Sequence, residues 1–139
     1  MTPASLSHLV LIPSYNPGSR VIDTVLAARR QWNPVWIVVD GSTDDSPRQL
    51  QAMATTDDGL HVIVLPENRG KGAAVLEGIT RAVAAGYTHA LTMDSDGQHP
   101  ADLIPAFMDV SQAHPEAMVL GTPVFAADAP ALRVNGRKV

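Results

Sequence analysis

The chain has 139 residues, of which 45% are hydrophobic and 17% are charged, and its formal net charge is −4. This length and composition indicate one domain with a substantial core rather than a solvated tail. The acidic balance argues against non-specific nucleic-acid binding, and the absence of cysteine excludes a disulfide framework and a thiolate zinc site. We find no signal segment and no run of about 18 apolar residues, and therefore expect a soluble, cytoplasmic protein.

Five short apolar runs alternate with segments of helical periodicity. The runs cover residues 8–16, 34–42, 60–68, 88–96 and 117–124. Their continuous apolar character is typical of strands that are covered on both faces. Helices are predicted over residues 18–31, from Ser46 onward, and over residues 70–85 and 100–113. The alternation predicts an α/β, Rossmann-like fold with a mainly parallel sheet and helices on both faces.

Polar or turn residues follow the first four apolar runs. These residues are Ser14-Tyr15-Asn16, Asp40-Gly41-Ser42, Glu67-Asn68 and Asp94-Ser95-Asp96. In an open parallel sheet, ligands bind beyond the carboxyl ends of the strands. The sequence therefore predicts one site that is drawn from four separate segments.

Asp94 and Asp96 place two carboxylates two residues apart at the end of the fourth run. In an extended segment such residues point to the same side, so both can approach one cation. Mg²⁺ takes one or two carboxylates from a protein and completes its shell with substrate phosphates. The alternative is an Asp-rich turn in which Asp94 caps and Gly97 turns the chain. His99 is either a further metal ligand or a group that packs beside the carboxylates.

Three other features have both a binding interpretation and a structural one. Asp40 can accept hydrogen bonds from a base or ribose, or can form an Asx-turn. The segment ENRGKGAAVLEG (67–78) resembles a phosphate-binding glycine loop but lacks the full P-loop pattern. Arg69 and Lys71 place positive charge beside a helix start, which favours anions, or they are solvated cations. Tyr15 either lines a base pocket or packs.

The segments LVLIPSYN, VVDGST, ENRGKGAAVLEGI and TMDSDGQHPADLIP resemble, in order and spacing, the family 2 glycosyltransferases. The Gln98-His99-Pro100 extension is similar to the polyprenyl-phosphate branch, which includes dolichol-phosphate mannosyltransferases. The resemblance covers roughly residues 8–125. It implies a GT-A nucleotide-sugar-binding domain over residues 1–125, incomplete at its C-terminus. Residues 126–139 would then be the start of an acceptor-side region or a disordered tail.

The resemblance also implies an activity and a set of residues. The activity is transfer of a sugar from a nucleotide-diphosphate sugar to an acceptor, either a lipid-linked phosphate or a cell-envelope component, with inversion. The implied donor-binding residues are Pro13, Tyr15, Asp40, Arg69, Lys71, Asp94 and Asp96. Asp94 and Asp96 would hold the ribose and a Mg²⁺ or Mn²⁺ ion on the diphosphate.

The remaining donor-binding residues divide between the two halves of the nucleotide. By the same resemblance, Pro13, Tyr15 and Asp40 would border the nucleoside. Arg69 and Lys71 would lie along the base and the diphosphate. No catalytic base is assigned from the sequence.

The chain departs from the family pattern in three places. Val39 stands where the family often has an acid, and Leu76 stands where the polyprenyl branch often has arginine. Gly121-Thr122-Pro123 replaces a Gly-Ser-Arg sequence of that branch. Because the family's catalytic domains are longer, we expect that the chain is truncated at Val139.

The last residues are basic and follow a stretch rich in proline and alanine. Arg137 and Lys138 are hypothesised to contact a lipid phosphate or an anionic membrane surface, which would place the protein at the inner face of the membrane. The alternative is a frayed, solvated terminus.

Two other functions remain open at this stage. A non-catalytic nucleotide-sugar-binding module would use the same donor residues without turnover. A haloacid-dehalogenase-type phosphatase would use Asp94 as its nucleophile, because Asp94-Ser95-Asp96-Gly97 resembles the core motif of that class. That nucleophile normally follows the first strand, whereas Asp94 follows the fourth, so we rank this function last.

Overall fold

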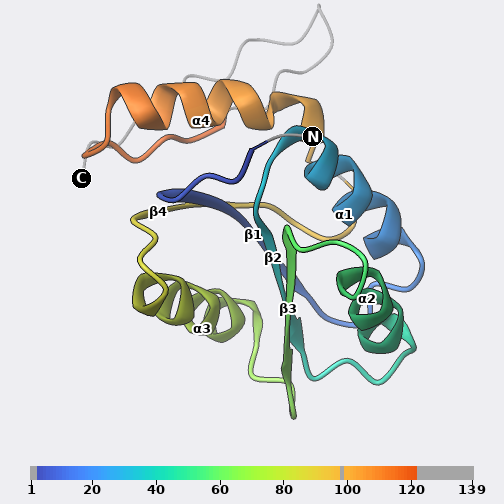
Figure 1. The fold of residues 1–139 in the computed structure, drawn as a ribbon. Helices are drawn as coiled ribbons and strands as arrows, with labels where there is room; N and C mark the ends of the chain where they lie inside the picture. Colours follow the sequence, from blue (N-terminus) through green and yellow to red (C-terminus); the bar gives the residue numbers. More distant parts are fainter. Residues whose placement is uncertain (1–2, 98, 122–139) are drawn as a thin grey trace, which may run out of the picture.

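The computed structural model describes residues 3–97 and 99–121, and Figure 1 shows how they fold. Four parallel strands form one sheet in the order β3-β2-β1-β4. The strands are β1 (His8–Ser14), β2 (Val35–Asp40), β3 (Leu60–Leu65) and β4 (His89–Thr92). The α/β fold with a parallel sheet, predicted from the apolar runs, is confirmed. Because the strands are parallel, all four carboxyl ends lie at one edge of the sheet.

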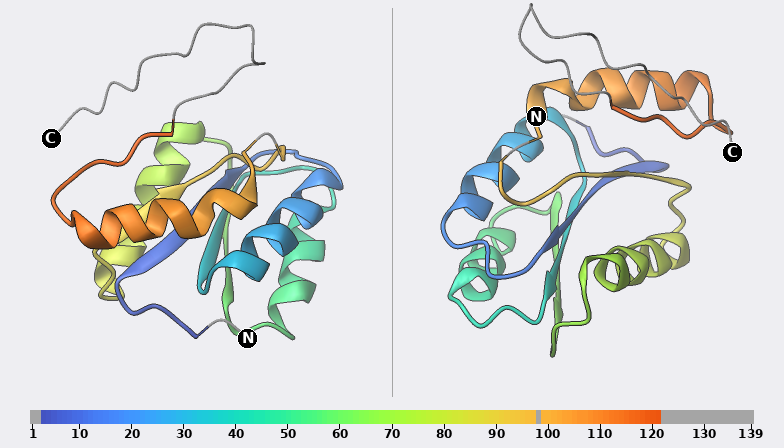
Figure 2. Two further views of the ribbon diagram at one scale, coloured as in Figure 1. Left: turned by 90° about the horizontal axis from the view of Figure 1, so that it is seen from above. Right: turned by 180° about the vertical axis from the view of Figure 1, so that it is seen from behind.

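The helices cover both faces of this sheet, as predicted. They are α1 (Arg20–Gln31), α2 (Ser46–Ala54), α3 (Lys71–Ala84) and α4 (Ile104–Ala113), the last preceded by the 3₁₀-helix η1 (Ala101–Leu103). Figures 1 and 2 show α3 on one face and α1, α2 and α4 on the other. The predicted helical segments thus agree with the structure to within a few residues at each end.

The core has two parts because successive residues of a strand face opposite sides of the sheet. Val10 and Ile12 of β1 pack with residues of α1, α2 and α4. Leu9 and Leu11 belong to the second cluster, which α3 covers. Every residue of β1 is buried, as expected for an inner strand of a parallel sheet. This double burial explains why the run in the sequence is continuously apolar.

The fifth predicted strand, over residues 117–124, is wrong for the part that the structure describes. Residues 117–121 form no strand, and residues 122–124 lie outside the described residues. Met118 and Leu120 are 52% and 46% exposed, and Gly121 packs against the ring of Phe107 in α4. An apolar run becomes a strand only when a neighbouring strand satisfies its backbone, and this segment pairs with none in the described chain.

The strand β4 forms one edge of the sheet, and it pairs with β1 from His8–His89 to Leu11–Thr92. Its residues alternate between half-buried and exposed, unlike the fully buried β1 and β2. Among the helices that the structure describes, none has the length and apolar character needed to cross a bilayer.

Candidate functional site

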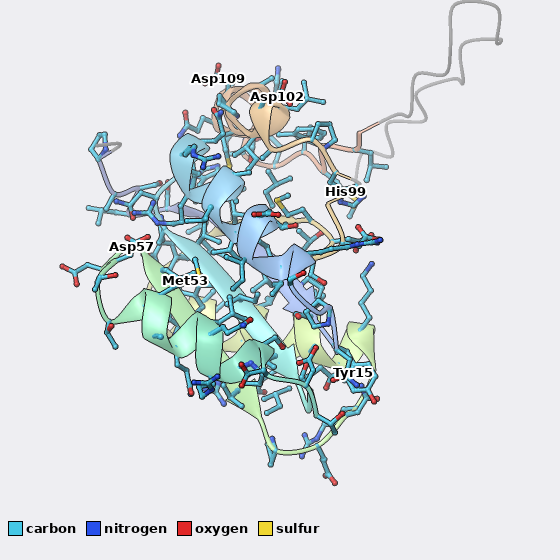
Figure 3. The ribbon with its side chains drawn as sticks, turned by 90° about the vertical axis from the view of Figure 1, so that its right-hand side faces the viewer. Tyr15, Met53, Asp57, His99, Asp102 and Asp109 are labelled. Atoms are coloured by element: carbon cyan, nitrogen blue, oxygen red, sulfur yellow. The ribbon has the colours of Figure 1, made fainter. Side chains whose placement is uncertain are left out.

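A cavity of about 390 Å³ lies beyond the carboxyl ends of the strands. Its lining comes from all four segments that carry polar residues after an apolar run. The lining residues are Pro13, Ser14, Tyr15, Asp40, Asn68, Lys71, Ala74, Asp94, Ser95 and Asp96. Figure 3 shows Tyr15 on the same side of the molecule as His99, and Asp57 on the opposite side. The topology therefore brings together groups as far apart in the sequence as Pro13 and Asp96.

Most of the residues predicted for donor binding meet in this cavity. The ones that line it are Pro13, Tyr15, Asp40, Lys71, Asp94 and Asp96. Arg69 does not line it, and its guanidinium lies 4.0 Å from the carboxylate of Glu67. Arg137 and Lys138 lie outside the described residues. Donor binding by any of these side chains stays a prediction.

Asp40 organises the loop that leads into α3. It is buried, and its carboxylate accepts hydrogen bonds from the backbone N–H groups of Arg69 and Gly70, both at 2.9 Å. The side-chain amide of Asn68 donates to the same carboxylate at 3.2 Å and to the Asp40 carbonyl oxygen at 3.2 Å. Arg69 thus contacts Asp40 through its backbone N–H and not through its guanidinium. Asp40 holds the glycine loop in place, whichever other contact it makes.

Gly41 allows β2 and this loop to approach each other closely. A Cβ at this position would lie 2.2 Å from the backbone nitrogen of Asn68, and the φ angle of Gly41 is 69°. Both the contact and the left-handed backbone favour glycine. The Asp40-Gly41 pair therefore joins the end of β2 to the start of α3.

Lys71 and Asp94 form an ion pair across the cavity. The ammonium of Lys71, the first residue of α3, contacts Asp94 Oδ1 after β4. His99 Nδ1 accepts the backbone N–H of Asp94 at 3.0 Å, and His99 Nε2 lies 3.8 Å from Asp94 Oδ2. This hydrogen bond occupies the Nδ1 lone pair of His99, so the structure favours the second of the two predicted roles, a group that positions Asp94.

The donor set of the cavity fits a hard divalent cation bound together with phosphates. Asp94 and Asp96 both line it, which supplies the one or two carboxylates that Mg²⁺ takes from a protein. No cluster of three or more potential His, Cys, Asp or Glu ligands occurs among the described residues.

A hydrogen-bonded pair of loops forms the rim next to Tyr15. Asn16, whose φ is 44°, accepts the backbone N–H groups of Thr43 and Asp44 at 2.7 and 3.2 Å. Asp44 accepts the backbone N–H of Gly18 at 3.0 Å and the hydroxyl of Ser46 at 2.6 Å. Burial raises the pKa of Asp44, but these hydrogen bonds outweigh it and hold the pKa below its usual value. Each of the two loops at the rim thus accepts a hydrogen bond from the other.

A second cavity of about 330 Å³ lies between α1 and the segment after β4. Arg20, Asp23 and His99 contribute to its lining, and it shares Asp96 with the first cavity. The acidic segment therefore faces two neighbouring hollows.

The sequence predicts no individual role for Ser14, Asn16 or Asn68. Asn68 positions the loop through Asp40, Asn16 fixes the rim, and Ser14 lies in the cavity wall. All three were visible as polar residues that end an apolar run. The hydrogen-bond partners of Asn16 and Asn68 lie 26 to 28 residues away in the sequence, which no local pattern reveals.

Comparisons with known proteins place the chain among glycosyltransferases. The chain is 32% identical over 108 residues to polyprenol monophosphomannose synthase of Mycolicibacterium smegmatis, which covers 76% of the chain and 41% of the relative. It is 32% identical over 111 residues to undecaprenyl-phosphate 4-deoxy-4-formamido-L-arabinose transferase of Klebsiella pneumoniae, covering 72% and 32%. The fold is similar to the crystal structure of S. aureus TarS 1-349, with a TM-score of 0.64 and 20% identity over 89% of this chain and 38% of that one.

The chain spans about a third to two fifths of the length of the two curated relatives. The family description "Glycosyl transferase family 2" matches residues 9–138, which is nearly the whole chain. The chain belongs to glycosyl transferase family 2.

Proposed function

We propose that this chain is the donor-binding part of a glycosyltransferase that transfers a sugar from a nucleotide-diphosphate sugar to a lipid-linked phosphate. Family membership supports glycosyl transfer, and the two curated relatives are named for polyprenol and undecaprenyl-phosphate chemistry. The observation that carries the proposal is the cavity at the strand ends, where Lys71 and a carboxylate pair meet. This combination suits a diphosphate with its counter-ion.

The chemical task is to expel a nucleoside diphosphate from the anomeric carbon of a sugar. Asp94 and Asp96 would hold a Mg²⁺ or Mn²⁺ ion, which neutralises charge on the departing diphosphate when it is bound. Lys71 would exchange its contact with Asp94 for a contact with the diphosphate. Tyr15, which is half-exposed at the rim, would cover the nucleoside.

The acceptor determines whether a base is required. A phosphate monoester is already ionised near pH 7, so its oxygen attacks without a strong base. Attack from the face opposite to the departing diphosphate inverts the anomeric centre. A lipid phosphate would also bring the protein to the membrane surface on its cytoplasmic side.

Calorimetric titration with UDP and with GDP, each in the presence of Mn²⁺, tests this proposal. One of the two should bind, and EDTA should weaken that binding by about fivefold or more, since neutralising a charge at 4 Å is worth ~1 kcal/mol even in water. Asp96→Asn should weaken it in the same way, because the amide keeps the shape and loses the charge. Equal affinity with and without metal would exclude the metal role.

A measurement of sugar transfer distinguishes the proposed enzyme from a non-catalytic binding module. A longer version of the protein that reaches the length of its relatives should transfer sugar to a polyprenyl phosphate, and Asp96→Asn should abolish this transfer. Binding without any donor turnover would favour the binding module. The phosphatase alternative predicts release of inorganic phosphate from a monoester, which the proposed function does not.

A further inference from the structure

Ser14 is a buried polar group without a partner in the cavity wall. It ends β1, it is 3% exposed, and it lines the cavity of about 390 Å³. Its hydroxyl oxygen is buried and has no hydrogen-bond partner within residues 3–97 and 99–121. Buried hydroxyl groups are nearly always hydrogen-bonded, because leaving one unpaired costs its lost hydration. A hydroxyl left unpaired beside a binding cavity therefore indicates a contact that a ligand completes.

The neighbours of Ser14 do not offer this contact. Val39 lies opposite Ser14 in the register between β1 and β2, and its buried side chain is apolar. Asp40 follows, and its carboxylate is engaged by Arg69, Gly70 and Asn68. No hydrogen bond holds the Ser14 hydroxyl, so it can change rotamer toward a ligand without breaking one.

We propose that the Ser14 hydroxyl hydrogen-bonds the nucleoside part of the donor and contributes to the choice of base. This inference rests on the proposed nucleotide binding. In the register between β1 and β2 the residue opposite Ser14 is the apolar Val39, whereas the charged groups that would match a diphosphate, Lys71 and Asp94, come from α3 and from the segment after β4. A base or ribose instead offers neutral donors and acceptors of the kind that one hydroxyl can pair.

The change Ser14→Ala tests the inference because it should move stability and binding in opposite directions. Removing an unpaired buried hydroxyl should leave the melting temperature unchanged or raise it. The same change should weaken binding of UDP or GDP, whichever the wild type binds with Mn²⁺, by about threefold to tenfold, the worth of one neutral hydrogen bond. Binding of inorganic pyrophosphate with Mn²⁺ should not change.

Ser46 offers a matched control. It is 2% exposed, and its hydroxyl donates to Asp44 at 2.6 Å. Ser46→Ala removes a paired buried hydroxyl, so the melting temperature should fall, while the cavity wall keeps Ser14. The difference in melting temperature between the two variants thus distinguishes an unpaired buried hydroxyl from one that stabilises the fold.

Each outcome decides between the possibilities. Weaker nucleotide binding with unchanged pyrophosphate binding supports the nucleoside contact. Equal nucleotide affinity in Ser14→Ala and wild type overturns it and leaves the proposed function standing. Weaker binding of both probes overturns it as well, because the hydroxyl would then serve the diphosphate. If the wild type binds neither nucleotide, the proposed function and this inference both fail.

Discussion

The carboxylate of Asp94 is neutralised by a cation from the chain itself. The Lys71 ammonium contacts it, although both side chains remain partly exposed, at 66% and 30%. The sequence places these residues 23 apart, so the pairing follows from the fold, which sets the start of α3 beside the end of β4. A cation that binds Asp94 must therefore compete with Lys71.

We predict that Lys71→Met raises the affinity of the protein for Mn²⁺ when no nucleotide is present. The expected gain is up to about fivefold, because exposed ion pairs are worth up to about 1 kcal/mol. The same variant should bind UDP or GDP more weakly, since the diphosphate loses its ammonium partner. Titration of Mn²⁺ followed by electron paramagnetic resonance measures the first effect, and calorimetry measures the second.

Arg69→Met provides the control for net charge. It removes one positive charge from the same loop, but its guanidinium lies beside Glu67 and not in the cavity lining. Its Mn²⁺ affinity should remain close to that of the wild type. An unchanged Mn²⁺ affinity in Lys71→Met would mean that the contact with Asp94 does not control cation binding.

The residues that line the cavity could be predicted from the sequence as a group, but their individual hydrogen bonds could not. Polar residues after apolar runs point to one edge of a parallel sheet, and Asp40, Lys71 and Asp94 do lie at one cavity. The engagement of Asp40 with the loop of Arg69 and Gly70 depends on how closely two loops pack. Such packing is set by Gly41 and its surroundings rather than by any local pattern.

At the level of elements, α3 packs closely against the sheet at Gly78. A Cβ on Gly78 would lie 2.7 Å from Leu11 Cδ1 and 3.0 Å from Val38 Cγ2. The start of α3 carries Lys71 and its end is anchored by Ala82. Gly78 thus lets α3, which begins at Lys71, pack closely against β1 and β2.

Gly78→Ala is expected to lower the free energy of unfolding by about 1–3 kcal/mol, the usual cost of overpacking a well-packed core. Gly72→Ala, in the same helix, should raise it by up to about 1 kcal/mol, because nothing lies within 4 Å of a Cβ there and alanine favours the helix. Urea denaturation measures both values. The prediction fails if the two changes have the same sign.

A stacked histidine pair joins β1, β4 and the end of α4. The rings of His8 and His89 lie 4.3 Å apart and are parallel within 1°. His8 is buried and its ring nitrogens bond the hydroxyls of Ser7 and Ser111. Burial, and then the charge of His89, lower the pKa of His8 below its usual value.

This lowered pKa predicts that the protein loses stability in mild acid. The unfolded chain takes up a proton on His8 below about pH 6.5, whereas the folded chain resists it until a lower pH. Stability from this site is therefore full above that pH and falls as the pH drops below it. The pKa of His61 is also lowered, first by burial and then by Arg81, and adds an effect of the same sign.

Melting temperatures measured between pH 7.5 and 5.5 should decrease toward acid, and His8→Gln should flatten the decrease. His114→Gln is the matched control, because His114 is exposed near the end of α4. If His8→Gln leaves the slope unchanged, the histidine pair does not govern acid stability.

At the scale of the whole molecule, the inner strands of the sheet can be predicted from the sequence more directly than the strands at its edges. Runs covered on both faces, such as β1 and β2, are recognised by composition alone. The run at residues 117–121 has similar composition but no strand beside it in the described chain. Pairing depends on a partner elsewhere in the polypeptide, so composition cannot decide whether such a run becomes a strand.

The helix α3 carries an apolar stripe that is exposed to solvent. Leu76 and Val83 are each 65% exposed, and Ile79 is 37% exposed. Their spacing of three and four residues places them on one side of the helix. Exposed apolar groups that cluster in this way promote association, and β4 adds a sheet edge with no partner strand among the described residues.

We therefore expect this chain to self-associate with rising concentration, and Leu76→Gln with Val83→Gln to suppress the association. Sedimentation velocity over a concentration series measures it. Glutamine is chosen because it removes the apolar surface without changing charge, so altered repulsion cannot account for the result. Ala52→Gln, which is exposed on α2 at the other face of the sheet, is the control and should associate like the wild type. Association that persists in the double variant would locate the contact elsewhere, with the open edge of β4 as the next surface to block.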